Sequence, residues 1–181
     1  MKLSQDLQEF LNYPVLQKMD ATTGLPENEE LYDLVSQSVL VVFLTGLYKS
    51  TRTKEAAEEI HKQQNAKELL EKMFQDKAAV LTVVAEYTNK PEDYINTKLE
   101  EVATGYLQMI NQSDYVTALQ KENSLEEIMS SERHNILACL PPKLKAGKLF
   151  SDETIDDNTN KMEGPISSLM NKIGDVFSSG D

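Results

Sequence analysis

Two side chains at helical spacing form the first candidate site. Glu58 and His61 have the Glu-x-x-His spacing that supplies ligands in di-iron carboxylate bundles. Such a centre needs a second copy of the motif, but the other histidine, His134, has Ser131 where the glutamate would be required. Because Glu58 and His61 also lie among charged neighbours, we interpret them as part of a solvated helix face.

A second candidate is the acidic run that starts at Asp156, which begins like a calcium-binding loop. Asp156, Asn158 and Asn160 would occupy positions 1, 3 and 5 of such a loop. The loop also needs glycine at position 6 and a bidentate glutamate at position 12, where this chain has Lys161 and Ser167. The sequence therefore predicts a polar turn of helix or loop here rather than a metal site.

The single cysteine, Cys139, is a third candidate, with His134 as its base. Five residues apart on a helix, the two side chains point in different directions. Cys139 also lies near a predicted helix C-terminus, where the negative end of the dipole disfavours a thiolate. We therefore interpret it as a packed core residue. One cysteine also excludes an intrachain disulfide and a zinc site with two or four cysteines.

Motifs for other chemistry are missing from the sequence. It contains neither a Gly-rich phosphate loop nor a Gly-x-Ser-x-Gly elbow. Carboxylates are abundant, but nothing in the sequence places a pair of them in a cleft. We therefore predict no catalytic, metal or cofactor site, and a protein that is not an enzyme.

The charge balance also excludes classes of partner. The chain has 30 Asp and Glu against 18 Lys and Arg, a net charge of −12. Nucleic-acid binding draws its affinity from clustered Lys and Arg, and the one local basic group, Lys143, Lys145 and Lys148, is followed at once by the acidic stretch 152–157. We expect binding neither to nucleic acid nor to anionic membrane surfaces.

Location is predicted from apolar runs and from the cysteine. No apolar region of a secretory signal follows Lys2. The longest continuous apolar run in the most apolar stretch is Val39–Leu44, which is too short to span a bilayer. With a lone cysteine, this predicts a cytoplasmic protein without membrane insertion.

The elements that must position these side chains are predicted to be helices, since seven Gly and six Pro are few for an all-β fold. Glu27, Glu29 and Glu30 fit the N-terminus of a long helix. Its apolar residues recur at helical spacing over Leu31–Leu47 and surround its centre, which predicts a buried core helix. The valines of 39–42 alone would suit a strand, but the longer spacing favours the helix.

Caps and apolar stripes predict further helices around this one. Thr53, Pro91 and the capping box of Ser124 with Glu127 mark three of the beginnings. The predicted ranges are 5–12, 54–64, 66–74, 77–87, 91–111, 115–119, 124–140 and 166–177. We therefore predict an all-α fold, a single globular domain of about eight to ten short and medium helices. Residues 1–150 form this domain, and 151–181 form an acidic connection and a C-terminal amphipathic helix packed on it.

A weak internal similarity relates two of these helices. Residues 40–48 can be laid over 99–107, with Gly46 and Gly105 near corresponding ends, and 140–147 would be a third, degenerate copy. A match this short can also arise by chance. Glycine in a helix costs about 1 kcal/mol relative to alanine, so we interpret both glycines as sites of close contact between helices.

The C-terminal stripe is a candidate for contact rather than chemistry. Its apolar positions are Ile166, Leu169, Met170, Ile173 and Phe177. It can pack on the protein's own core or, with the preceding Gly-Pro pair as a hinge, serve as a detachable helix or an oligomer contact. Its polar face has one lysine opposed by an aspartate, which argues against membrane-surface binding.

The hydrophobic rhythm resembles that of a known family. Val39–Leu47 (VLVVFLTGL) followed by Thr53–Ile60 resembles the YidB-like family of small bacterial helical proteins, as does Thr88–Ile95 leading into Leu99–Ile110. The resemblance extends over residues 30–178. It implies a helical fold and brings no known activity or functional residue.

The sequence thus predicts a non-enzymatic helical protein that acts by protein–protein contact or self-association. Its acidic surface would favour basic partners. The alternative is a module that binds an apolar small molecule or acyl chain between its helices, in a core rich in Leu, Val and Met.

Overall fold

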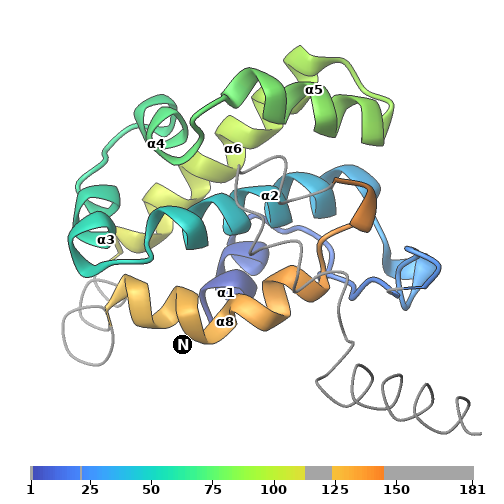
Figure 1. The fold of residues 1–181 in the computed structure, drawn as a ribbon, viewed down its shortest axis with the longest axis horizontal. Coiled ribbons are helices and arrows are strands. Elements are labelled where there is room, and N and C mark those ends of the chain that lie inside the picture. The colour runs from blue at the N-terminus through green and yellow to red at the C-terminus, as the bar shows by residue number, and fades with distance from the viewer. Residues whose placement is uncertain (1, 21, 113–123, 145–181) are drawn as a thin grey trace, which may run out of the picture.

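The computed structural model describes residues 2–20, 22–112 and 124–144, and most of these residues are in helices (Figure 1). In chain order the elements are α1 (Leu3–Phe10), the 3₁₀ turn η1 (Glu29–Leu31), α2 (Leu34–Ser50), α3 (Lys54–His61), α4 (Ala66–Met73), α5 (Lys77–Thr88), α6 (Glu92–Ile110), α8 (Leu125–Ala138) and the 3₁₀ turn η2 (Pro142–Leu144). The described residues include one isolated β-bridge, between Met19 and Pro26.

The predicted all-α fold is confirmed, with one difference in the number of helices. The described residues form seven α-helices, slightly fewer than the eight to ten predicted. The helices predicted at 115–119 and 166–177 lie outside the described residues, as do the boundary between 150 and 151 and residues 145–147 of the proposed third copy.

Helix α2 lies in the middle of the molecule (Figure 1). Its residues 37–47 are all buried, and helices α3, α4, α5, α6 and α8 pack around it. A helix that is hydrophobic on all sides needs such a covering, so the prediction of a core helix is confirmed and its valines adopt helix rather than strand. Among the described helices, none has both the length and the hydropathy of a membrane span.

The beginning of α2 differs from the prediction. The predicted single helix from residue 28 onwards was wrong, because η1 is a separate turn and α2 begins only at Leu34. The side chain of Asp33 accepts a hydrogen bond of 2.7 Å from the backbone N–H of Ser36. Asp33, which looks like an interruption in the apolar run, is therefore the N-cap of the helix.

Other predicted helix beginnings agree with the structure. Thr53 accepts a bond of 3.2 Å from the N–H of Ala56 at the start of α3. Ser124 and Glu127 form both halves of the capping box of α8. Pro91 was predicted to be the first helical residue. It is instead the N-cap of α6, which begins one position later at Glu92.

A side chain from another part of the chain packs closely against each of the two helical glycines, Gly46 and Gly105. A Cβ added to Gly46 in α2 would lie 2.6 Å from the ring of Phe74, which follows α4. A Cβ added to Gly105 in α6 would lie 2.6 Å from Cδ2 of Leu11, which follows α1. The prediction of close packing at both glycines is confirmed.

Candidate functional site

Among the described residues, those singled out for chemistry are not brought together into one site. Glu58 and His61 are both exposed on α3. His134 is exposed on α8 whereas Cys139, just after it, is buried. In the described ranges no group of three or more His, Cys, Asp or Glu is placed to hold a metal ion. The calcium-like run from Asp156 lies outside those ranges.

A groove of about 380 Å³ lies between α1, the segment that follows it and the C-terminal part of α8. We call it the α1–α8 groove. Its apolar lining consists of Val15, Leu16, Ile136 and Cys139, and its charged lining of Lys2, Glu9 and Lys18. The volume is within the range of small ligand sites, but the hollow is open rather than enclosed.

The first wall of the groove, α1, is held by a buried carboxylate from α8. Glu132, only 4% exposed, accepts hydrogen bonds from the backbone N–H of Leu3 at 2.5 Å and of Ser4 at 3.0 Å, and from the Ser4 hydroxyl. The local N-cap residue, Lys2, makes no side-chain capping bond. Glu132 therefore supplies the cap from a distant helix, and its negative charge meets the positive end of the α1 dipole.

The second wall, residues 15–18, is held by a buried amide from α2. The Gln37 Oε1 accepts from the N–H of Gln17 at 2.8 Å, and its Nε2 donates to the carbonyl oxygens of Gln17 at 2.6 Å and Cys139 at 2.8 Å. Next to it, the N–H of Met19 donates to the carbonyl of Ala138 at 2.8 Å. Both walls are thus fixed to α8 by buried hydrogen bonds, and the groove is preformed.

The groove is open enough to admit a ligand, but the thiol of Cys139 in its lining is poorly suited to react. Burial raises the pKa of Cys139 to about 11, despite the opposing effect of the nearby positive charge of Lys18. A thiol with that pKa stays protonated at neutral pH and is a poor nucleophile. The prediction of a packed, unreactive cysteine agrees with this environment.

A second surface runs along α6. Residues 94, 98, 101 and 105 share one face of this helix because they are three or four positions apart. The Cδ1 of Phe10 lies 3.6 Å from the position of a Cβ on Gly105, and the Tyr13 hydroxyl donates to Oε1 of Glu101 at 3.4 Å. We call Phe10, Tyr13 and Tyr94 the aromatic stripe.

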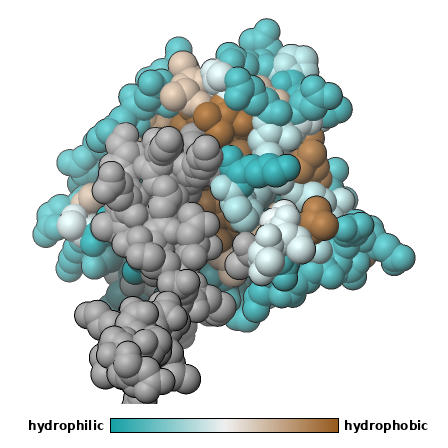
Figure 2. Space-filling view, turned by 45° about the vertical axis from the view of Figure 1, so that its right-hand side comes forward, coloured by the Kyte–Doolittle hydropathy of each residue, from teal (hydrophilic) through white to brown (hydrophobic). Residues whose placement is uncertain are grey.

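The aromatic stripe is accessible and flanked by charges. Phe10 is 41% exposed and Tyr94 42% exposed, and Lys98 forms an ion pair of 2.7 Å with Glu101 beside them. Burial and then the charge of Glu101 raise the pKa of Tyr13, with smaller effects from Tyr94 and Asp33. The Tyr13 hydroxyl therefore stays a donor well above neutral pH. Hydrophobic residues are visible between hydrophilic ones on the face drawn in Figure 2.

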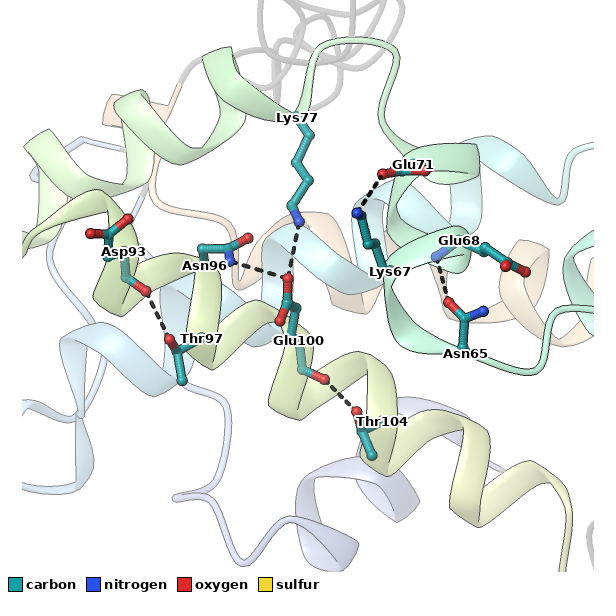
Figure 3. Close-up of polar contacts among 10 residues, drawn as sticks. All are labelled: Asn65, Lys67, Glu68, Glu71, Lys77, Asp93, Asn96, Thr97, Glu100 and Thr104. Atoms are coloured by element: carbon teal, nitrogen blue, oxygen red, sulfur yellow. Dashed lines mark hydrogen bonds and ion pairs between the residues drawn. The ribbon is translucent and has the colours of Figure 1, made fainter.

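A polar cluster at the start of α5 has a structural explanation (Figure 3). Glu100 on α6 accepts from Lys77 at 3.3 Å and from Asn96 at 3.1 Å, which ties the first turn of α5 to α6. The pair of Lys67 and Glu71 on α4 is separate and solvent-exposed. Surface pairs of this kind contribute little to stability, and no pocket described includes Glu100.

Sequence reasoning missed Glu132 and Gln37, the two residues whose hydrogen bonds hold the walls of the groove in place. Glu132 lies on the buried stripe of α8, between Met129 and Ile136. Gln37 lies in the buried part of α2. A charged or amide residue at a position where the helical period requires an apolar one is a signal for a buried partner, and this signal was available in the sequence.

Neither a protein-family model nor a curated protein nor a solved structure matches this chain. The resemblance to the YidB-like family stays a prediction from the hydrophobic pattern.

Proposed function

We propose that this chain is a non-enzymatic helical protein that acts by protein contact, and that a second copy of the chain binds at the aromatic stripe. The observation that supports this is the exposure of Tyr94 on α6 and of Phe10, the last residue of α1, which lies against α6 at Gly105. Aromatic residues are enriched in protein interfaces, and tyrosine is among the residues enriched at their energetic centres. They bury a large area at a low cost in side-chain entropy.

The charges beside the stripe support a second copy as the occupant. In a two-fold contact the same patch serves both subunits, so it must be complementary to itself. The stripe is flanked by one cation, Lys98, and by the anions Glu101 and Asp33. Two copies related by a two-fold axis can therefore place each Lys98 opposite a carboxylate of the other copy.

Two further features belong to this proposal. The net charge of −12 supports the expectation that the protein does not bind nucleic acid, because an acidic surface repels phosphates. The free, buried thiol of Cys139 is compatible with a cytoplasmic location, where thiols are kept reduced.

The proposal is tested by following backbone amide resonances as the protein is diluted. We expect the resonances of residues 10–13 and 94–105 to shift with concentration, and those of α4 to stay constant. The double substitution Phe10→Ser with Tyr94→Ser should abolish the shifts. Leu25→Ser is the matched control, because Leu25 is a similarly exposed apolar residue (52%) in the loop between Met19 and Pro26.

Two results would contradict the proposal. One is the absence of any concentration-dependent shift up to the solubility limit. The other is an equal loss of the shifts in the Leu25→Ser control, which would mean that any exposed apolar residue has this effect.

A further inference from the structure

We propose that Tyr48, Arg52 and Arg133 bind a small dianion, which is a ligand with a phosphate group or with two carboxylates. We call these three residues the two-arginine site. Tyr48 lies near the end of α2, Arg52 between α2 and α3, and Arg133 on α8, and these three helices pack on one another (Figure 1). The site shares no residue with the aromatic stripe, so the inference goes beyond the proposed contact between copies.

The two-arginine site gathers every arginine of the chain. Of the 18 Lys and Arg, only Arg52 and Arg133 are arginine. They are far apart in the sequence, yet their guanidinium carbons lie 5.3 Å and 5.7 Å from the centroid of the same ring, that of Tyr48. A guanidinium group presents its N–H donors in a rigid planar fork that matches the oxygens of phosphate and carboxylate, whereas lysine is a point charge. The fold thus concentrates its two specialised anion-binding side chains at one place.

Packing explains one arginine at this ring but not two. A guanidinium group over a tyrosine ring makes an attractive cation–π contact, and the negative end of the α2 dipole favours a cation at Arg52, just beyond that helix. Arg133 comes from within α8 instead and brings a second positive charge to the same ring. Like charges at such distances repel each other. A dianion bound to both guanidinium groups removes that repulsion.

Arg133 lacks a polar partner within the part of the chain that the structure describes. Its Nε is buried and has no hydrogen-bond partner there, and none of the ion pairs formed among those residues includes it. A buried donor without a partner is uncommon in native proteins and calls for an explanation such as a bound water or ion. The chain has 30 Asp and Glu, so carboxylates are plentiful. An arginine that pairs with none of those described is available to a ligand.

A ligand can reach the two-arginine site from solvent. Arg52 is exposed, and Arg133 and Tyr48 are partly exposed. A guanidinium group has five N–H donors, so Arg52 can bind an anion beside the other contacts that it makes. A bidentate oxyanion uses two N–H groups of the fork. At Arg133 the Nε and a terminal nitrogen form such a pair, and the bound ligand then supplies the partner that Nε lacks.

Nitrogen-15 NMR of the full chain provides the test, because each arginine gives one Nε–H signal and the chain has only two arginines. Arg52→Lys and Arg133→Lys each remove one signal and so assign both. The protein is titrated at neutral pH with sodium phosphate and, separately, with sodium succinate, while sodium chloride keeps the ionic strength constant. We expect both signals to shift and to reach saturation. Saturation with phosphate alone identifies a phosphate group as the ligand, saturation with succinate alone identifies a dicarboxylate, and saturation with both shows that the site recognises the two charges.

A matched pair of substitutions separates recognition by guanidinium groups from general attraction. Arg52→Lys keeps the positive charge but removes the planar fork, and we expect the dissociation constant, read from the Arg133 signal, to rise about tenfold. Lys54→Gln removes a positive charge from an exposed position near Arg52 at the start of α3, and it should change the dissociation constant by less than about twofold. Because both side chains are exposed, neither substitution should unfold the protein.

Three results would overturn the inference. The first is that neither anion shifts either signal beyond the sodium chloride reference. The second is a shift that grows with both anions without saturation, which would indicate screening alone. The third is a dissociation constant that Arg52→Lys leaves unchanged, or that Lys54→Gln raises as much as Arg52→Lys does. The same titration of Phe10→Ser with Tyr94→Ser, which leaves the two-arginine site intact, makes the outcome independent of contact between copies.

Discussion

A carboxylate on α8 completes the N-terminus of α1, and the energetic consequence can be measured. Glu132→Gln keeps the shape of the side chain but removes its charge and replaces one acceptor with an N–H₂ group, which cannot accept from Leu3 or Ser4. We expect a loss of about 1–3 kcal/mol in the free energy of unfolding, because a buried donor is left without a partner. Urea titration followed by circular dichroism measures it.

Glu86→Gln is the matched control for this prediction. Glu86 is exposed on α5, and the same chemical change there should alter stability by no more than about 0.5 kcal/mol. Equal losses in the two variants would mean that Glu132 does not have the role we assign to it.

The thiol of Cys139 gives a prediction about pH. Burial raises its pKa from the ordinary value of 9.0 to about 11, so the folded state holds this proton more tightly than the unfolded state. The stabilisation is complete below pH 9 and is lost as the pH rises towards 11. Brief pulses of an alkylating agent should show a reaction rate with its midpoint near pH 11 for the native chain and near pH 9 in urea. A native midpoint near pH 9 would contradict the buried environment.

At the residue scale, the sequence was more informative about local partners than about distant ones. The capping box of Ser124 and Glu127 was predictable because its members are three positions apart. The partners of Glu132 are 128 and 129 positions away, and one partner of Gln37 is 102 positions away. Hydrophobic periodicity shows that these two side chains are buried, but not which backbone groups they meet.

At the element scale, the two helical glycines should respond differently to alanine. Alanine is intrinsically better than glycine in a helix by about 1 kcal/mol. At Gly46 the new methyl group would meet the ring of Phe74, with Met73 beside it, in the core. Overpacking of this kind typically costs about 1–3 kcal/mol, so we expect Gly46→Ala to be destabilising. Thermal unfolding compares it with Gly105→Ala.

Gly105→Ala should be close to neutral or stabilising. The nearest atom there is the end of the Leu11 side chain, which is only partly buried and can move. A Gly46→Ala variant as stable as Gly105→Ala would show that the contact with Phe74 is not tight.

Helix boundaries were predictable wherever a cap was visible, but the entry to α2 was not. Three glutamates in front of an apolar run are as compatible with the first turn of a long helix as with the separate turn η1. What decides between them is the Asp33 cap, three positions before the residue that donates to it. The order of helices and the central place of α2 follow from periodicity, whereas the neighbours of each helix depend on packing that periodicity does not encode.

At the scale of the whole molecule, the net charge opposes contact between two copies. Each copy has a net charge of −12, and salt screens this repulsion over a Debye length of about 8 Å at physiological ionic strength. Self-association should therefore strengthen as salt is added. Binding of a basic partner would weaken instead, so the sign of the salt dependence measured by light scattering distinguishes the two kinds of partner.

Sedimentation equilibrium over a range of concentrations tests the central claim, contact through the aromatic stripe, most directly. A single chain has a mass of 20.4 kDa. We predict that the average mass of the natural chain rises towards that of a dimer with concentration. We also predict that Phe10→Ser with Tyr94→Ser keeps it at the monomer value and that Leu25→Ser behaves like the natural chain. A natural chain that stays a monomer at every concentration would contradict the account.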